Sequence, residues 1–249
     1  MKKSEVCGNE LDIIELNCGE GIMLSLKKIP QGEFLMGSEN FFDAQPIHKV
    51  MISEPFYIGI YPVTQAQYMA VIGSNPSKFQ GFKNPVDSVF WKDAMIFCKT
   101  LSQKIGMKVG LPSEAQWEYA CRAEGETLYC FGNKEEQLKE YANYEDTPIY
   151  GKKSTSPIGI FKPNAWGLYD MHGNLWEWCE DIWHDNYEGA PVDGTAWTYG
   201  EPLGRIEHLY RGGSWGMYAR GCHSSMRSRF ASRCVAPYLG FRIVLKSIS

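Results

Sequence analysis

Residues 211–242 read RGGSWGMYARGCHSSMRSRFASRCVAPYLGFR and form the most unusual stretch of this chain. Two short motifs frame it, RGGSW at 211–215 and LGFR at 239–242. Between them lie four arginines and no acid, mixed with Met, Tyr, His, Cys, Phe and Pro. This mixture follows neither the helical period nor the strand period. The stretch is therefore an active site, a binding surface or a basic loop.

The composition is that of a folded, loop-rich protein. Of the 249 residues, 44% are hydrophobic and 22% charged, so a packed core is expected. Aromatic residues reach 14% beside 25 glycines, which suits loops that pack by burying indole rings. Residues 216–249 carry six Lys or Arg and no acid, whereas the whole chain has a net charge of -4. A basic C-terminal surface favours acidic partners, unless these arginines pair with acids of the body.

The cysteines do not form a recognisable metal or redox motif. There are 8, and no two are spaced as C-x-x-C, which disfavours zinc-ribbon and thioredoxin chemistry. The chain is also too large to need a disulfide framework. Cys98 and Cys121 lie on apparent helix faces, so we expect them to be buried thiols.

Nothing in the sequence predicts a membrane span. No run of about 18 apolar residues exists. The start, MKKSEVCGNELDIIEL, has two lysines but no apolar stretch after them, so no signal segment is expected in this chain. This favours the cytoplasm, unless a leader was removed.

The first third of the chain predicts strands and a well-capped helix. Residues 23–38 alternate around a Pro-Gln-Gly turn and predict a hairpin, and residues 49–60 predict another strand. The helix that follows is predicted to have Thr64 as its N-cap, with Gln67 completing a capping box. Gly73 is predicted to end it.

The middle of the chain predicts two more helices and then long loops. One helix is expected over residues 91–105, ending at Gly106, and a shorter one is capped by Ser113 with Gln116 three residues on. From Glu124 onward the chain is mostly loop, and short strands are expected near residues 176–179, 210–214 and 240–245. Strands and helices of this kind predict a single α+β domain with long packed loops.

Six strings resemble one known family when taken together. In order, they are IPQGEFLMGS, YPVTQAQY, LPSEAQWEYACRA, NAWGLYDMHGNLWEWCED, RGGSW and LGFRIVL. Their order and spacing from Ile29 to Leu245 resemble the formylglycine-generating-enzyme (sulfatase-modifying factor) subtype of the C-type lectin fold. The resemblance implies an N-terminal extension over residues 1–22. One domain then covers residues 23–249, with a C-terminal variable region at about 211–242.

The resemblance leaves the activity open because this fold hosts both catalysts and binding proteins. In the enzymes it implies a pair of cysteines that binds copper(I), at positions that correspond here to Met217 and Cys222. Two thiolates hold copper(I) tightly, whereas the neutral thioether of Met217 cannot become a thiolate. Cys234 matches no position of that pattern, and a lone Cys222 is expected to be a scaffold thiol. A copper-dependent oxidase with an altered cysteine site is therefore the alternative.

Other catalytic and metal-binding patterns are weak. The five histidines have no zinc or iron spacing, and neither a G-x-S-x-G string nor a phosphate-binding glycine loop is present. By resemblance, Asn174 and Glu177 lie near a calcium site of the enzymes. We expect that the binding protein requires no cofactor, with a structural calcium near these two residues as the optional one. The alternative is that both side chains hydrogen-bond to neighbouring loop backbone.

The stretch at 211–242 also resembles the variable region of proteins diversified by bacterial diversity-generating retroelements, which keep RGGSW and GFR as frames. The resemblance implies fixed scaffold residues at Ala219, Arg220, Cys222, Ser224, Ser225, Arg227 and Arg229. It implies varied, ligand-binding residues at Gly216, Met217, Tyr218, Gly221, His223, Met226, Ser228, Phe230, Cys234, Val235, Ala236 and Tyr238.

This second resemblance implies a non-enzymatic ligand-binding protein. A rigid scaffold would present side chains that lose little entropy on binding. We expect both frames to lie in strands of one sheet, and the fixed arginines to point inward or sideways. We also expect one exposed patch containing most of Met217, Tyr218, His223, Met226, Phe230 and Tyr238.

The ligand is expected to be a macromolecule, namely a protein and not a nucleic acid. The chain is expected to be a monomer, exported or at the cell surface by resemblance, with the cytoplasm as the alternative. Two other interpretations stay open at this point. The stretch is an irregular basic loop packed on the core, or the chain is a lectin-like domain with one fixed partner.

Overall fold

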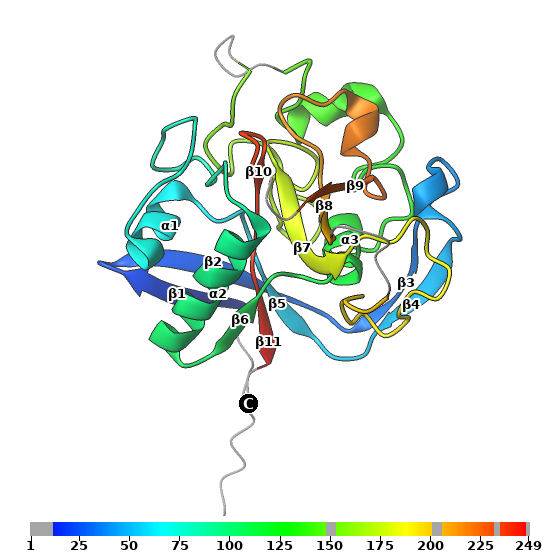
Figure 1. The fold of residues 1–249 in the computed structure, drawn as a ribbon. Coiled ribbons are helices and arrows are strands. Elements are labelled where there is room, and N and C mark those ends of the chain that lie inside the picture. Colours follow the sequence, from blue (N-terminus) through cyan, green and yellow to red (C-terminus); the bar gives the residue numbers. More distant parts are fainter. Residues whose placement is uncertain (1–11, 148–152, 201–205, 232–234, 248–249) are drawn as a thin grey trace, which may run out of the picture.

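A computed structural model of the chain describes residues 12–147, 153–200, 206–231 and 235–247 (Figure 1). The described residues form three sheets, three α-helices and three short 3-10 helices. Helices and strands are mixed along the chain, and long loops connect them in its second half. This is the α+β, loop-rich architecture that the sequence predicts.

A five-stranded antiparallel sheet joins the N-terminal part of the chain to its C-terminal strand, in the order β1-β2-β5-β11-β6. Its strands are β1 (Ile13–Gly19), β2 (Ile22–Ile29), β5 (Phe56–Gly59), β6 (Lys108–Gly110) and β11 (Val244–Ser247). The last strand, β11, lies between β5 and β6. The helices α1 and α2 contact this sheet at its β1, β2 and β6 strands.

The predicted N-terminal extension over residues 1–22 is wrong in its second half. Strand β1 pairs with β2 from Ile13 opposite Lys27 onward. Leu16 and Cys18 are buried in the core, whereas Glu15 and Asn17 between them face outward. This period-2 alternation is a strand signal that the sequence carried. The domain therefore includes residues from at least Ile13.

A four-stranded sheet in the order β10-β7-β8-β9 carries the stretch 211–242. Its strands are β7 (Trp176–Ile182), β8 (Glu207–Arg211), β9 (Arg227–Ala231) and β10 (Leu239–Gly240). Strand β10 is parallel to β7, and the other pairs are antiparallel. The first frame leaves β8 at Arg211 and the second contains β10, so both frames are anchored in one sheet, as predicted.

A separate two-stranded sheet consists of β3 (Gly32–Met36) and β4 (His48–Ile52), with the 3-10 helix η1 (Phe42–Ala44) in their connection. The hairpin predicted at residues 23–38 is wrong because its two strands do not pair with each other. Strand β2 pairs with β1 and β5, whereas β3 pairs with β4. The Pro-Gln-Gly turn passes the chain from one sheet to the other. The single strand predicted at 49–60 is likewise two strands, β4 and β5.

The three predicted helices are present, and each predicted cap lies where the sequence places it. In α1 (Gln65–Ile72), Thr64 Oγ1 accepts a hydrogen bond from the backbone N–H of Gln67 at 3.3 Å, and Gly73 ends the helix at φ 84°. Helix α2 (Trp91–Ile105) ends at Gly106 with φ 71°. Helix α3 (Glu114–Arg122) carries the capping box of Ser113 and Gln116. These local signals are strong because each satisfies a backbone group that the helix leaves unpaired.

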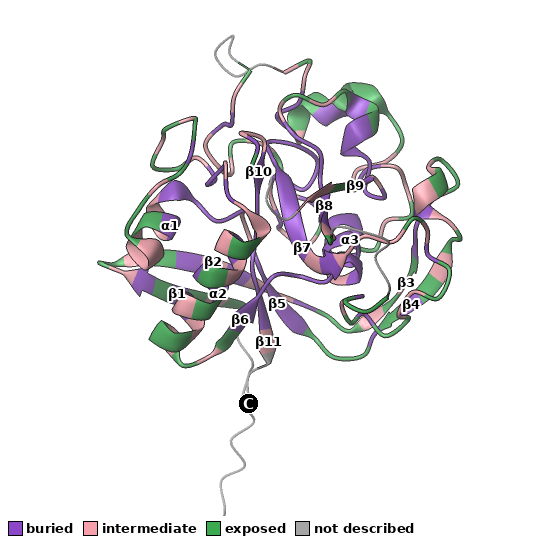
Figure 2. Cartoon of the chain, viewed as in Figure 1, coloured by how far each residue is buried: buried purple, intermediate pink, exposed green. Residues whose placement is uncertain are grey.

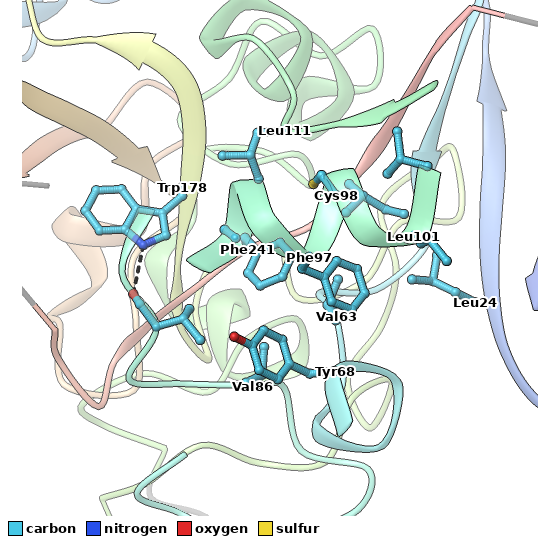
Figure 3. Close-up of a cluster of buried hydrophobic side chains, with 14 of the residues drawn as sticks. Leu24, Val63, Tyr68, Val86, Phe97, Cys98, Leu101, Leu111, Trp178 and Phe241 are labelled. Carbon is cyan, nitrogen blue, oxygen red and sulfur yellow. Dashed lines mark hydrogen bonds between the residues drawn. The ribbon is translucent and has the colours of Figure 1, made fainter. Parts of the chain in front are cut away.

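Buried residues concentrate in the central strands and on one side of the helices (Figure 2). Figure 3 shows the cluster at α1 and α2, in which Phe97 lies 5.6 Å from Tyr68 and 5.3 Å from Phe241, measured between ring centroids. The indole N–H of Trp178 donates to the Val89 carbonyl at 3.1 Å. Cys98 is buried there, and burial raises the pKa of its thiol to about 12. The scaffold under the four-stranded sheet is therefore densely packed.

Candidate functional site

The two frames are fixed by buried arginines. Arg211 forms an ion pair with Glu118 and donates to the Met226 carbonyl at 2.7 Å. Arg242 holds Glu177 through Nε at 2.5 Å and Nη2 at 2.7 Å. All four charged side chains are fully buried, so these hydrogen bonds are charge-assisted and strong. The ends of the stretch are thereby fixed to the scaffold.

The glycines of the first frame let the next turn pack against it. Gly213 has φ +75°, a left-handed conformation that other residues adopt at a cost. A side chain at this position would place Cβ 2.6 Å from Cys222 Sγ and 2.8 Å from the Gly221 carbonyl oxygen. The chain after RGGSW therefore folds back onto its own frame.

The first arm of the stretch, residues 216–222, presents alternate residues to solvent. Gly216, Tyr218 and Arg220 are exposed, and Tyr218 has 70% of its surface accessible. Beneath them the 3-10 helix η3 (Ala219–Cys222) buries Ala219 and Cys222. The exposed Tyr218 side chain therefore directly precedes a helix whose residues Ala219 and Cys222 are buried in the core.

The second arm is β9, one of the two edge strands of the four-stranded sheet. Strand alternation places Arg227 and Arg229 on one face and Ser228 and Phe230 on the other. Ser228 Oγ donates to the Tyr210 hydroxyl at 3.1 Å, and the Phe230 ring lies 6.3 Å from the Tyr210 ring. One face of β9 therefore presents Ser228 and Phe230 over aromatic neighbours.

The third arm, residues 235–238, lies next to the start of the stretch. The indole N–H of Trp215, in the first frame, donates to the Pro237 carbonyl at 3.1 Å, and the Tyr238 ring lies 6.5 Å from the Trp215 ring. Val235 is exposed on the same arm. Met217, Met226, Phe230 and Tyr238 all pack, partly buried, against one core cluster. The stretch therefore folds back, so that Trp215 near its start meets Pro237 and Tyr238 near its end.

The prediction that most of the six patch residues are exposed to solvent is wrong. Tyr218 alone of the six residues expected in the patch is exposed, and Met217, Met226, Phe230 and Tyr238 are partly buried. Three of the twelve predicted variable residues are buried: Gly221, His223 and Ala236. Gly216 and Val235 are exposed, Ser228 is partly buried, and Cys234 lies outside the described residues. The assignment of all twelve as varied residues stays a prediction.

His223 is buried because its ring fills an aromatic site. It lies 5.0 Å from the Tyr129 ring and 5.6 Å from the Phe41 ring. Burial lowers the pKa of His223 to about 4, and the neighbouring His172 and Arg220 lower it further. The imidazole is therefore neutral at pH 7 and belongs to the scaffold.

The arginines that were predicted to be fixed point inward or sideways. Arg227 is buried and binds Glu114 through Nε at 2.6 Å, and its guanidinium lies 4.2 Å from the Tyr187 ring. Burial opposes the ionisation of Glu114, yet the charges of Arg227 and Arg211 hold its pKa below the usual value. Arg229 is exposed and pairs with Asp185 at 3.0 Å. Much of the basic charge of this region is thus balanced by acids of the body.

The residues at the copper positions of the resemblance do not fit two-thiolate ligation. Met217 offers a thioether, and Cys222 is fully buried with its thiol pKa raised to about 12 by that burial. A thiol with this pKa stays protonated at pH 7, and copper(I) needs the thiolate. We therefore derive no step through copper in this chain.

The side chains at the suggested calcium position already have protein partners. Glu177 accepts from the indole N–H of Trp117 at 2.7 Å as well as from Arg242. Asn174 accepts from the Ser156 N–H at 2.9 Å, the loop-backbone contact given as the alternative. The Glu177 carboxylate does not fit a cation because the Arg242 guanidinium occupies it. Across the described ranges, no three His, Cys, Asp or Glu side chains group as a metal site. Calcium bound by Glu177 is therefore not expected, and a structural calcium near Asn174 stays a prediction.

Sequence reasoning missed the connection between β3 and β4 as a neighbour of the site. Arg220 Nη2 donates to the Asn40 carbonyl at 3.2 Å, and Arg227 donates to the Asp43 carbonyl. The partners lie about 180 residues apart in sequence. No local pattern in a single sequence signals a contact of this kind.

The fold and this geometry agree with the comparisons to known proteins. Residues 25–247 match the Sulfatase-modifying factor enzyme 1-like domain. The chain belongs to this family. Its fold is the C-type lectin fold of the formylglycine-generating-enzyme subtype, as the sequence predicted.

Two solved structures are similar to this chain over almost its whole length. Treponema denticola variable protein 1 superposes with a TM-score of 0.84 at 26% identity, covering 96% of this chain and 100% of that one. PvdO from Pseudomonas aeruginosa superposes with a TM-score of 0.83 at 30% identity, covering 93% and 97%. The resemblance to the variable proteins is confirmed.

An enzyme of the family is also similar in sequence. The formylglycine-generating enzyme of Mus musculus is 30% identical over 208 residues, which cover 79% of this chain and 52% of the mouse enzyme. The chain therefore spans about half the length of that relative. In the part of the chain that the structure describes, no helix has the length and apolar character needed to cross a bilayer.

Proposed function

We propose that this chain is a non-enzymatic ligand-binding protein whose stretch at 211–242 forms a binding surface diversified by a retroelement. The surface comprises the exposed residues Gly216, Tyr218 and Val235. It is completed by the partly buried residues Met217, Met226, Ser228, Phe230 and Tyr238.

One observation carries the proposal. Both ends of the stretch are fixed in one sheet by the buried pairs of Arg211 with Glu118 and Arg242 with Glu177. Between these ends, Tyr218 is exposed and Phe230 is partly exposed on an edge strand. Such a scaffold presents aromatic side chains with little conformational entropy left to lose on binding. The similarity to Treponema denticola variable protein 1 supports the same conclusion.

The ligand suited to this surface is a macromolecule, and we propose a protein. Tyr and Phe provide large contact areas, and Met217 and Met226 provide adaptable apolar contacts. A monomer displayed at the cell surface or exported from the cell would reach such a ligand, with the cytoplasm as the alternative location.

A copper-dependent oxidase with an altered cysteine site is the second candidate, favoured by the 30% identity to the mouse enzyme and by Cys222. The two candidates differ in copper(I) affinity. We expect no tightly bound stoichiometric copper(I), because only one of the two thiol positions is filled. A chelator competition that finds one tightly held copper per chain, lost in Cys222→Ser, would contradict the binding proposal and favour the oxidase.

Variation of the gene tests the binding proposal. The 3′ end of the gene is sequenced in sibling strains and compared with the flanking DNA. We expect amino-acid changes concentrated at the predicted variable positions, with Arg211, Arg227 and Arg242 unchanged. We also expect a near-copy of the 3′ end beside a reverse transcriptase gene. Changes spread evenly along the gene, with no near-copy, would contradict diversification.

A further inference from the structure

The connection between β3 and β4, residues 37–47, is held rigidly by the scaffold. The Gly37 N–H donates to Glu118 Oε1 at 3.0 Å, and Arg122 Nη2 donates to the Gly37 carbonyl at 3.1 Å. At the other end, the Tyr187 N–H donates to the Gln45 carbonyl at 2.6 Å. The connection is therefore a preformed part of the surface at the end of the β3–β4 sheet (Figure 1).

This connection lies directly against the stretch 211–242. The Arg220 guanidinium donates to the Asn40 carbonyl and lies 5.3 Å from the Phe41 ring. The Phe41 ring is 5.6 Å from the His223 ring. Arg220 and His223 thus hold the connection against the stretch. These contacts do not depend on the side chains at the neighbouring exposed positions.

Two side chains are exposed at the junction between the β3–β4 connection and the first arm, and a partner could contact both. Phe42 directly follows Phe41 and has 81% of its surface exposed. Arg220 is exposed, and its contacts are a carbonyl and an aromatic ring. Among the described residues, no carboxylate lies within ion-pair distance of Arg220, whereas Arg227, Arg229 and Arg242 each have at least one. Exposed aromatic rings and arginines are the residue types that dominate protein interfaces.

We propose that Phe42 and Arg220 form a constant anchor beside the variable residues, and that the partner is a folded acidic protein. Phe42 enters an apolar pocket of the partner, and Arg220 pairs with a carboxylate at the rim of that pocket. Charge complementarity argues for the acidic partner, because Arg220 is the cation of this junction that the chain itself leaves without a counter-ion among its described residues. The inference rests on the proposed function and adds residues outside the stretch to the binding surface.

The test uses the full chain and defined probes. A display library randomises the exposed and partly buried positions Gly216, Met217, Tyr218, Met226, Ser228, Phe230, Val235 and Tyr238. Binders are selected separately against α-lactalbumin and ovalbumin, two acidic folded proteins, and against lysozyme as a basic one. Phe42→Ser, Arg220→Gln and the control Ile13→Ser are then introduced into each selected binder, and dissociation constants are measured. Ile13 is exposed too, but it begins β1 in the other sheet.

We expect Phe42→Ser to weaken the independently selected binders of both acidic proteins by about tenfold or more, with Ile13→Ser unchanged. Arg220→Gln weakens binding to the acidic proteins and not to lysozyme. Binders that depend on the randomised positions but ignore both Phe42→Ser and Arg220→Gln would overturn this inference alone. A library that yields no binder to any probe would contradict the proposed function, and this inference with it. Equal melting temperatures of the parent and the Phe42→Ser variant establish that folding is unaffected.

Discussion

Replacing Arg227 by Met is expected to destabilise the fold far more than replacing Arg229, two residues away on the same strand. Arg227 is 1% exposed and Glu114 is 3% exposed. The pair is joined by Nε to Oε1 at 2.6 Å and by Nη2 to Oε2 at 3.1 Å. Arg227 also donates to the carbonyl of His184 at 3.2 Å. Arg227→Met therefore leaves a buried carboxylate with fewer partners.

The magnitude follows from the burial. Removing one partner of a buried ion pair costs about 3–5 kcal/mol. Glu114 keeps a hydrogen bond from the Tyr187 hydroxyl at 2.9 Å and the charge of Arg211, with Nε at 3.6 Å. We therefore expect the lower end, about 3 kcal/mol, and a fall in melting temperature of roughly 6–12 °C for a chain of this size. The Arg229 side chain is 45% exposed, so Arg229→Met should cost less than about 1 kcal/mol.

Urea denaturation followed by tryptophan fluorescence measures both variants against the parent. A double variant, Glu114→Gln with Arg227→Met, should recover part of the loss, because no uncompensated charge stays buried. Equal losses for Arg227→Met and Arg229→Met would refute this reasoning. They would mean that β9 is not fixed to the body through Arg227.

Three further outcomes are expected. Gly213→Ala should lower the melting temperature clearly, because Cβ would meet Cys222 Sγ at 2.6 Å in a left-handed conformation; an unchanged melt would contradict the close packing. Because the pKa of His223 falls from 6.5 to about 4 on folding, the unfolded chain alone takes up this proton between those pH values. The unfolding free energy should therefore drop as pH falls from about 6.5 to about 4, and urea titrations of His223→Phe should show a smaller drop. Tyr218→Ser should change stability by less than about 0.5 kcal/mol, whereas Trp178→Ala should cost about 3–5 kcal/mol; thermal melts in the reverse order would place the first arm in the core.

The sequence predicted best the features that depend on neighbouring residues. The capping box of Thr64 with Gln67 and the end of its helix at Gly73 are confirmed because each contact spans a few residues. The pairing of β2 could not be predicted in this way. The turn at 30–32 looks like a hairpin turn, but pairing depends on strands far along the chain, and β2 pairs with β1 and β5.

For the candidate site, the sequence predicted where the two frames lie but not which residues between them are buried. The frames RGGSW and LGFR correctly predicted that both ends of the stretch lie in one sheet, where β8 and β10 pair with β7. Buried ion pairs of Arg211 and Arg242 then fix these ends. The burial of His223 depends on the rings of Phe41 and Tyr129, which come from distant loops. Histidine and tyrosine both occur in buried and in exposed positions. The sequence alone therefore could not show that His223 is buried and Tyr218 exposed.

The central claim is that a replaceable surface is held between fixed frames. Saturation substitution of residues 211–242, displayed on cells and sorted for resistance to protease, measures this position by position. We expect broad tolerance at Gly216, Tyr218 and Val235, and intolerance at Arg211, Gly213, Arg227 and Arg242. Intolerance as strong at Tyr218 and Val235 as at Arg211 would contradict the account, because the stretch would then be part of the core and not a binding surface.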